Sequence, residues 1–414
     1  MNKKIGPLLL SGLMIGPILG SGIILLPPLA YGKLGASSLW AWVIIMALGA
    51  IFAVIFSKLS ILYPGDGGMT IAIEKSIGKK LKLYASLLMI SAVSFGPSAV
   101  MLTAADYLVK LEPLKNIPKP IIALVLVIIC FVLLLKDLKF ISTLSFVLSS
   151  SIAVILLVSS VVVLSGQPIE ITPVTQADPV SLGRVVLLLF WAIIGWEIVG
   201  NYSEQVRNLK KTIPQATAIS LVVITVTYIT IALAIQAFPY SESLSLVNIL
   251  EPTFGTASTL ILALLVTGLC ICTYLLIVGA LARLVCSLAE ENHLPLFFKK
   301  RNSNKIPVHG VLYFILVHSV VLTSSLLGIL DIEVIVSIAN GFFLANALIG
   351  LVAAFKIIDG FIFKSGAVIL SVSLLILLSF SSIPIFIALI VVYFVAAMLN
   401  KRSDRRNESL HIAS

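Results

Sequence analysis

The sequence predicts an all-α polytopic membrane protein, and three observations lead to this fold class. Hydrophobic residues make up 59% of the chain, charged residues make up 11%, and the mean hydropathy is +1.15. A soluble domain carries about 25% charged residues, so one water-soluble core cannot account for this composition. The apolar runs at 212–238, 256–282 and 383–399 hold too few charges to face water, and about 20 apolar residues span a bilayer.

About twelve membrane-spanning helices are expected, in order along the chain. They are predicted at residues 5–31, 37–62, 81–109, 118–136, 141–165, 180–208, 212–238, 256–289, 307–328, 332–356, 363–380 and 383–400. The connecting loops are short, and the longest, 166–179 and 290–306, have no room for a soluble domain. The first apolar segment continues into a second span, so we expect it to stay as a helix and not to be a cleaved signal peptide.

The first span contains residues that weaken a helix. Residues 16–28 read "GPILGSGIILLPP", and in a helix interior glycine costs about 1 kcal/mol and proline about 3. An unwound stretch survives in a membrane only where it lines a cavity. The amides of Ser21, Gly22 and Ile23 would begin a new half-helix and favour a carboxylate. The carbonyls of 16–19 would favour an ammonium group, and Gly20 and Gly22 would let a ligand approach the backbone.

The alternative for this stretch is a close helix-packing patch made by Gly12, Gly16 and Gly20. That alternative weakens because the sixth span, "VLLLFWAIIGWEIVGNYSE" at 186–204, is also interrupted, by Gly195 and Gly200. Paired broken helices five spans apart are typical of inverted-repeat transporters with a binding site at the membrane midplane.

The domain organisation follows from this pairing. The first half of a five-plus-five inverted repeat is expected at 1–165 and the second half at 180–356. Two trailing helices are expected at 363–400, followed by a cytoplasmic tail at 401–414.

Five motifs, in order along spans 1 to 9, resemble one family. They are "GPILGSGIILLPPLA" (16–30), "YPGDGG" (63–68) with "IGKK" (77–80), "FWAIIGWE" (190–197), "EQVRNLKKTIPQATAIS" (204–220) and "GALARLVCSLAEENHLP" (279–295). The pattern is similar to that of the amino acid–polyamine–organocation superfamily, in particular its bacterial arginine–agmatine antiporters and compact amino-acid exporters. The resemblance implies the five-plus-five repeat and a substrate held between helices 1, 3, 6, 8 and 10.

The resemblance also implies roles for individual residues. Ser21 and Gly22 match contacts to the substrate carboxylate, and the carbonyl of Ile18 matches an acceptor for its amino group. Trp191 and Ile194 match helix 6 carbonyls of the same kind.

Two residues of the sixth span are implied to take part in gating. Trp191 matches an aromatic gate over the substrate, and Glu197 matches an acid linked to gating. From the residues alone, Glu197 either binds a proton or is a buried carboxyl held by helix ends.

Two departures from the family pattern favour a particular substrate. Ile277 stands where the arginine carriers have a tryptophan, and Pro17 replaces a polar residue of helix 1. We therefore expect a secondary transporter of a neutral amino acid, aliphatic or methionine-like, which works by alternating access as an exporter, an exchanger or a proton-coupled permease. An arginine/polyamine antiporter remains the alternative. Some relatives carry a lysine on helix 5, but 140–209 holds none, so the coupling ion stays open and protons are one candidate.

The rival classes have weak support in the sequence. An integral membrane enzyme would need a constellation such as H-x-x-x-H, paired aspartates or G-x-S-x-G, and a channel or receptor would need a filter loop or sensor domain. We expect no enzyme activity, no cofactor and no metal site. The cysteines Cys130, Cys270, Cys272 and Cys286 all fall in predicted spans and are expected to be apolar packing residues.

The charge distribution predicts the orientation. If the N-terminus is cytoplasmic, 23 of the 28 Lys and Arg residues lie on the inner side and 5 on the outer side. We therefore expect a multi-pass protein of the cytoplasmic (inner) membrane with both termini inside. The net charge of +10 is then a topology signal that does not imply a nucleic-acid partner. The lipid bilayer is the expected partner, and a homodimer is left open.

The sequence also predicts the surroundings of four further side chains. Asp106 is predicted to be interfacial, and Trp40 and Trp42 to be interfacial belt anchors. His318 stands alone in its span and is expected to be hydrogen-bonded in the interior or to lie at the lipid edge; the alternative is a proton relay.

Overall fold

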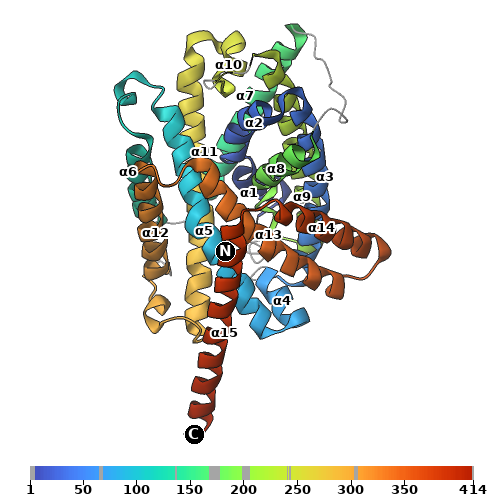
Figure 1. Cartoon of the computed structure of the whole chain (residues 1–414), viewed down its shortest axis with the longest axis vertical. Helices are drawn as coiled ribbons and strands as arrows, with labels where there is room; N and C mark the ends of the chain where they lie inside the picture. The colour runs from blue at the N-terminus through green and yellow to red at the C-terminus, as the bar shows by residue number, and fades with distance from the viewer. Residues whose placement is uncertain are drawn as a thin grey trace.

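The computed structural model describes residues 5–64, 69–135, 138–166, 178–197, 206–239, 241, 244–302 and 306–412. Within these ranges the chain is a bundle of helices (Figure 1). One isolated β-bridge joins the backbones of Ile5 and Val206. The α-helices are α1 Pro7–Leu19, α2 Gly22–Leu34, α3 Ser38–Leu62, α4 Met69–Ile77, α5 Lys79–Leu108, α6 Lys119–Leu134, α7 Leu138–Gly166, α8 Pro179–Leu189, α9 Leu209–Ala234, α10 Leu246–Phe254, α11 Ser258–Glu290, α12 Val308–Leu326, α13 Ile332–Ile357, α14 Phe361–Ser379 and α15 Ile383–Ile412.

The prediction of an all-α multi-pass membrane fold is confirmed. In the described ranges, nine runs of helix are long and apolar enough to cross a membrane. The first of these runs, Pro7–Leu62, contains two of the predicted spans, and two shorter apolar helices, Lys119–Leu134 and Pro179–Ile193, fall in two others. Together they account for the twelve predicted segments. The predicted end of the sixth span, with Gly200, and residues 65–68 of the "YPGDGG" motif lie outside the described residues.

The long helices α5, α11 and α13 form the centre of the bundle. α5 packs against both α11 and α13, and α1 packs against α7, α9 and α11. The buried faces of these helices belong to one continuous apolar core. By contrast, α14 and α15 lie at the periphery (Figure 1) and expose large apolar side chains such as Ile362, Val372 and Phe394. Exposed apolar surface of this kind suits contact with lipid.

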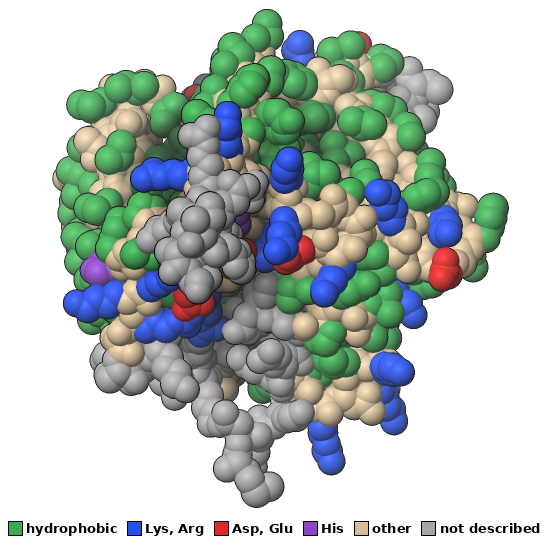
Figure 2. Space-filling view, turned by 90° about the horizontal axis from the view of Figure 1, so that it is seen from below, with side chains coloured by type: hydrophobic (Ala, Val, Ile, Leu, Met, Phe, Trp, Pro, Cys, Tyr) green, Lys and Arg blue, Asp and Glu red, His purple; other side chains and the backbone are tan. Residues whose placement is uncertain are grey.

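The lower end of the bundle in Figure 1, where α4 lies and α15 projects, carries many basic side chains (Figure 2). Lys75 ends α4, and Lys79, Lys80 and Lys82 occupy the first turn of α5. Lys82 forms ion pairs with Glu74 of α4 and Glu291, which follows α11, both at 2.8 Å. This basic end is the one that the charge distribution assigns to the cytoplasm.

The structure corrects one prediction about single residues. Trp42 is not an interfacial anchor, because it is fully buried and its ring stacks on Tyr228 with centroids 4.7 Å apart. Trp40 is partly exposed. Asp106 is partly exposed and pairs with Lys119, as expected for an interfacial acid. The four cysteines are buried and unpaired, as expected for packing residues.

Candidate functional site

The first span is broken between α1 and α2. α1 ends at Leu19 and α2 begins at Gly22, so the two residues between them, Gly20 and Ser21, interrupt the helix. Gly20 has φ +22°, and a Cβ there would lie 2.8 Å from the carbonyl oxygen of Pro17. Only glycine fits this position without strain. The predicted break is therefore present, at Gly20–Ser21.

The sixth span is also interrupted, close to the first break. α8 ends at Leu189, a 3₁₀ turn covers Phe190–Ile193, and Gly195 takes φ +125°. The amide of Asn340 in α13 donates hydrogen bonds to the carbonyls of Leu187 (3.0 Å) and Leu188 (3.4 Å). These carbonyls also share the backbone N–H of Phe190, and Asn340 adds a side-chain donor at the end of α8.

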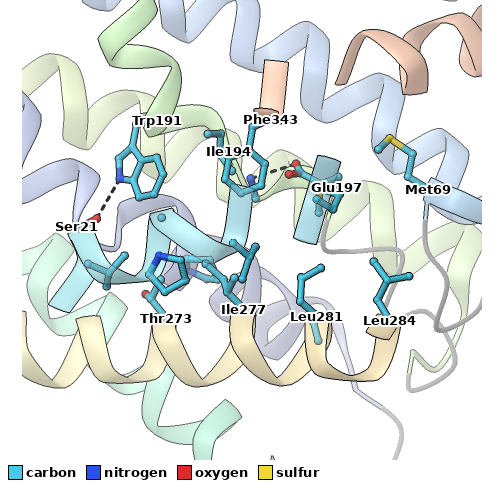
Figure 3. A pocket seen from close by; sticks show the side chains of 18 of the residues that line it. Ser21, Met69, Trp191, Ile194, Glu197, Thr273, Ile277, Leu281, Leu284 and Phe343 are labelled. Carbon is cyan, nitrogen blue, oxygen red and sulfur yellow. Dashed lines mark hydrogen bonds between the residues drawn. The ribbon is translucent and has the colours of Figure 1, made fainter. Parts of the chain in front are cut away.

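A cavity lies between the two breaks. Figure 3 shows side chains of the two broken spans and of α11 facing it. Its lining residues are Pro17, Ser21, Met69, Thr70, Met89, Val93, Gly96, Pro97, Val100, Trp191, Ile194, Gly195, Glu197, Thr273, Ile277, Ala280, Leu281, Leu284 and Phe343. Most of these side chains are apolar, and the polar ones are few.

Trp191 closes one end of the cavity. Its indole Nε1 donates a hydrogen bond of 3.0 Å to the Ser21 hydroxyl, and its ring meets Phe343 edge-on with centroids 6.4 Å apart (Figure 3). A Cβ at Gly96 would lie 2.9 Å from the indole, so the absence of a side chain there makes room for the ring. Met69 and Leu284 lie at the other end (Figure 3).

Glu197 lines the cavity and is 8% exposed. Its carboxylate accepts a hydrogen bond of 3.1 Å from the backbone N–H of Gly195. Thr273 of α11 reaches the first break from the opposite wall, where its hydroxyl donates to the carbonyl of Gly16 at 3.4 Å. Each break is therefore held by a polar side chain that also faces the cavity.

The predicted site residues fall into two groups. Five of them line the cavity: Ser21, Trp191, Ile194, Glu197 and Ile277. The other four, Ile18, Gly20, Gly22 and Ile23, belong to the broken helix but lie behind this lining.

Gly22 and Ile18 meet Tyr228 of α9 on the side away from the cavity lining. The Tyr228 hydroxyl donates to the Ile18 carbonyl at 3.0 Å. A Cβ at Gly22 would lie 2.7 Å from the same hydroxyl. Close packing against Tyr228 therefore accounts for this glycine.

Sequence reasoning missed several residues that shape the site. Thr273 and Phe343 face the cavity, while Tyr228 and Asn340 hold the broken helices from behind. None of these residues stands in a short motif. The pair Gly96–Pro97 inside a predicted span was a usable signal, because such residues weaken a helix for a reason. Among the described residues, no group of three or more His, Cys, Asp or Glu could hold a metal ion.

The fold and site define a membrane carrier with two broken helices, and comparison with known proteins identifies the family. The family model described as "Amino acid permease" matches residues 5–412, so the chain belongs to the amino acid permease family, within the superfamily that the motifs indicated. An uncharacterised amino acid permease of Bacillus subtilis is 23% identical over 330 residues, which cover 78% of each chain.

Two relatives from Escherichia coli have more specific names. An L-methionine/branched-chain amino acid exporter is 23% identical over 347 residues, 79% of each chain. A cadaverine/lysine antiporter is 24% identical over 336 residues, 75% of this chain and 72% of the antiporter.

Proposed function

We propose that this permease moves a neutral amino acid, aliphatic or methionine-like, across the cytoplasmic membrane by alternating access. The observation that carries the proposal is a cavity with an apolar wall beside two broken helices. Broken-helix ends provide partners for the amino and carboxylate groups that all amino acids share, and the wall selects the side chain.

The substrate carboxylate would bind near Ser21. The amides that begin α2 have no helical partner and carry the positive end of the helix dipole. Of the residues at this helix start, Ser21 lines the cavity, while Gly22 and Ile23 offer backbone amides behind it. The amino group would bind at the carbonyls of Trp191 and Ile194, because the Ile18 carbonyl lies behind the lining and accepts a hydrogen bond from Tyr228.

The apolar wall argues for a neutral side chain. Val93, Val100, Ile194 and Ile277 face the cavity, and a charged group placed there without a partner would cost several kcal/mol. The relative named as an exporter of methionine and branched-chain amino acids agrees with this substrate class.

A cationic substrate is the second candidate, and Glu197 favours it. Glu197 is the acidic residue that lines the cavity in the described part of the chain, and one relative is named as a cadaverine/lysine antiporter. The Gly195 amide already binds this carboxylate. We assign Glu197 to gating and proton coupling.

The conformation fits an inward-facing carrier. The cavity lies on the α4 side of Trp191, and the α4 end is the basic end of the bundle (Figures 1 and 2). Basic residues concentrate on the cytoplasmic side of membrane proteins. Trp191 and Phe343 would then separate the substrate from the outer side.

Counterflow in proteoliposomes tests the proposal. Vesicles loaded with unlabelled leucine or methionine should accumulate labelled leucine transiently, and vesicles loaded with arginine or cadaverine should not. Saturation and counterflow distinguish a carrier from a channel, and recovery of unchanged substrate excludes an enzyme. Arginine or cadaverine counterflow without leucine counterflow would replace the proposed substrate class with the cationic one.

A further inference from the structure

A buried histidine outside the cavity contacts the cavity wall. His318 of α12 is 0% exposed, and both of its ring nitrogens have partners. Nε2 lies 2.7 Å from the carbonyl oxygen of Val93 in α5, and Nδ1 lies 2.7 Å from the hydroxyl of Tyr274 in α11. The prediction of a hydrogen-bonded interior histidine is confirmed.

The Val93 carbonyl needs a partner because of Pro97. In a regular α-helix the carbonyl of residue 93 accepts a hydrogen bond from the N–H of residue 97. Pro97 has no N–H, so this bond cannot form within α5. An unpaired carbonyl in a membrane interior is costly, and the imidazole supplies the missing donor.

This arrangement determines the protonation of the ring. A carbonyl only accepts hydrogen bonds, so Nε2 carries the proton and donates to Val93. In the neutral ring Nδ1 is then the acceptor, and the Tyr274 hydroxyl donates to it. The ring thus joins α5, α12 and α11 through two directed hydrogen bonds.

The two helices that His318 joins carry cavity walls. Val93, Gly96 and Pro97 all line the cavity, and Gly96 lies against the Trp191 indole. On the other wall, Thr273 lines the cavity next to Tyr274.

We propose that His318 is a positioning residue that holds the segment Val93–Pro97 of α5, and thereby fixes the wall against which Trp191 and the substrate lie. The inference extends the proposed transport function by naming a specificity-determining residue that does not touch the substrate. It also explains a proline within a long central helix, because a side chain from another helix replaces the bond that the proline removes.

The test is a double-mutant cycle between His318 and Pro97. His318→Leu leaves the Val93 carbonyl unpaired and should raise the KM for the transported amino acid about tenfold, the loss expected for one buried hydrogen bond to the wall. A fall in the amount of folded carrier lowers Vmax alone, so the KM separates positioning from a merely structural role.

The second variant supplies the rescue. Pro97→Ala restores the N–H that Val93 requires, so His318→Leu should change KM less than about twofold in the Pro97→Ala background. Leu322→Ala, a buried apolar change one turn further along α12, is the matched control; it should lower stability equally in both backgrounds and leave KM unchanged.

Two kinetic outcomes overturn the inference: an unchanged KM in His318→Leu, or an equal KM increase with and without Pro97→Ala. The melting temperatures of the natural protein, His318→Leu, Pro97→Ala and the double variant give a second double-mutant cycle, which needs no substrate. If no amino acid is transported, the proposed function fails, while non-additive melting temperatures at 97 and 318 still support the link between them. Additive melting temperatures reject it independently of transport.

Discussion

The hydroxyl of Tyr228 donates a hydrogen bond of 3.0 Å to the carbonyl of Ile18, at the point where the first helix breaks. Tyr228 is fully buried, and its ring stacks on Trp42. One side chain of α9 therefore holds the end of α1 and passes close to the start of α2 at Gly22. The first break is therefore held by Tyr228 from outside the cavity lining as well as by Thr273 from within it.

Replacing Tyr228 with phenylalanine should weaken this support. Tyr228→Phe keeps the stacking on Trp42 but removes the donor, so we expect a loss of about 1 kcal/mol of stability. The end of α1 would also lose its position, which should raise the KM for substrate. Thermal unfolding and transport kinetics of the purified variant measure the two effects.

Tyr393→Phe is the matched control, because Tyr393 lies on α15 with 53% of its surface exposed. It should leave both stability and KM near the values of the natural protein. If Tyr228→Phe behaves like this control, the hydroxyl does not position the first helix.

Trp191 should matter more for transport than any other aromatic residue. Trp191→Leu removes the hydrogen bond to Ser21 and the edge contact with Phe343. We expect Vmax/KM to fall by more than about tenfold, equivalent to about 1.4 kcal/mol, with near-normal expression. Uptake assays at matched protein levels provide the measurement.

The control for this variant is Trp40→Leu, since Trp40 is partly exposed. Trp42 is unsuitable, because its ring packs on Tyr228 and its loss would disturb the first break. Equal losses of transport at positions 191 and 40 would reduce Trp191 to a packing residue.

Local signals explain what the sequence could predict. Gly20 and Gly195 interrupt helices through their own backbone conformations, so both breaks were visible in short stretches of sequence. The residues that hold the breaks were not visible. Thr273, Tyr228 and Asn340 reach across from helices distant in sequence, and no helical periodicity marks which polar residue of a span meets which carbonyl.

The error at Trp42 has a similar origin. A tryptophan near the end of an apolar run fits a membrane interface on composition alone. Its burial depends on Tyr228, which lies in another span. Ser21 faces the cavity and Gly22 faces Tyr228, and this difference also depends on contacts between spans. One residue step around a helix changes which neighbouring helix a residue contacts.

The ion pairs at the basic end should make stability depend on acid pH. The hydrogen bond from Lys82 holds the pKa of Glu74 below its ordinary value of 4.5. A lowered pKa in the folded state contributes stability above the ordinary pKa, and this contribution is lost as the pH falls through the folded-state value. Glu74 is 29% exposed, so the effect should be about 1 kcal/mol or less.

Melting temperatures between pH 7 and pH 3 test this assignment. Glu74→Gln should be less stable than the natural protein at pH 7, and the difference should shrink as the pH falls below about 4.5. Glu112→Gln is the control, because Glu112 is 86% exposed in its pair with Lys115. A stability difference at position 74 that is constant with pH would show that the Lys82 pair contributes nothing through ionisation.

Gly22 provides the sharpest test of how the first break is built. A Cβ at Gly22 would lie 2.7 Å from the Tyr228 hydroxyl. This hydroxyl is held by its hydrogen bond to the Ile18 carbonyl, and the Tyr228 ring is held by stacking on Trp42. Gly22→Ala should therefore displace the hydroxyl, lower the melting temperature and raise the KM together. Helix propensity alone would predict the opposite change in stability, a gain of up to about 1 kcal/mol.

Gly279→Ala is the matched control, because it lies within α11 and a Cβ there would make only ordinary contact with Leu134, at 3.5 Å. It should keep or raise stability and leave KM unchanged. Combining Gly22→Ala with Tyr228→Phe should relieve the clash, since the displaced hydroxyl is then absent, so the double variant should be more stable than the sum of the single losses predicts. Strictly additive losses of stability would mean that the loss at Gly22 does not come from packing against the Tyr228 hydroxyl.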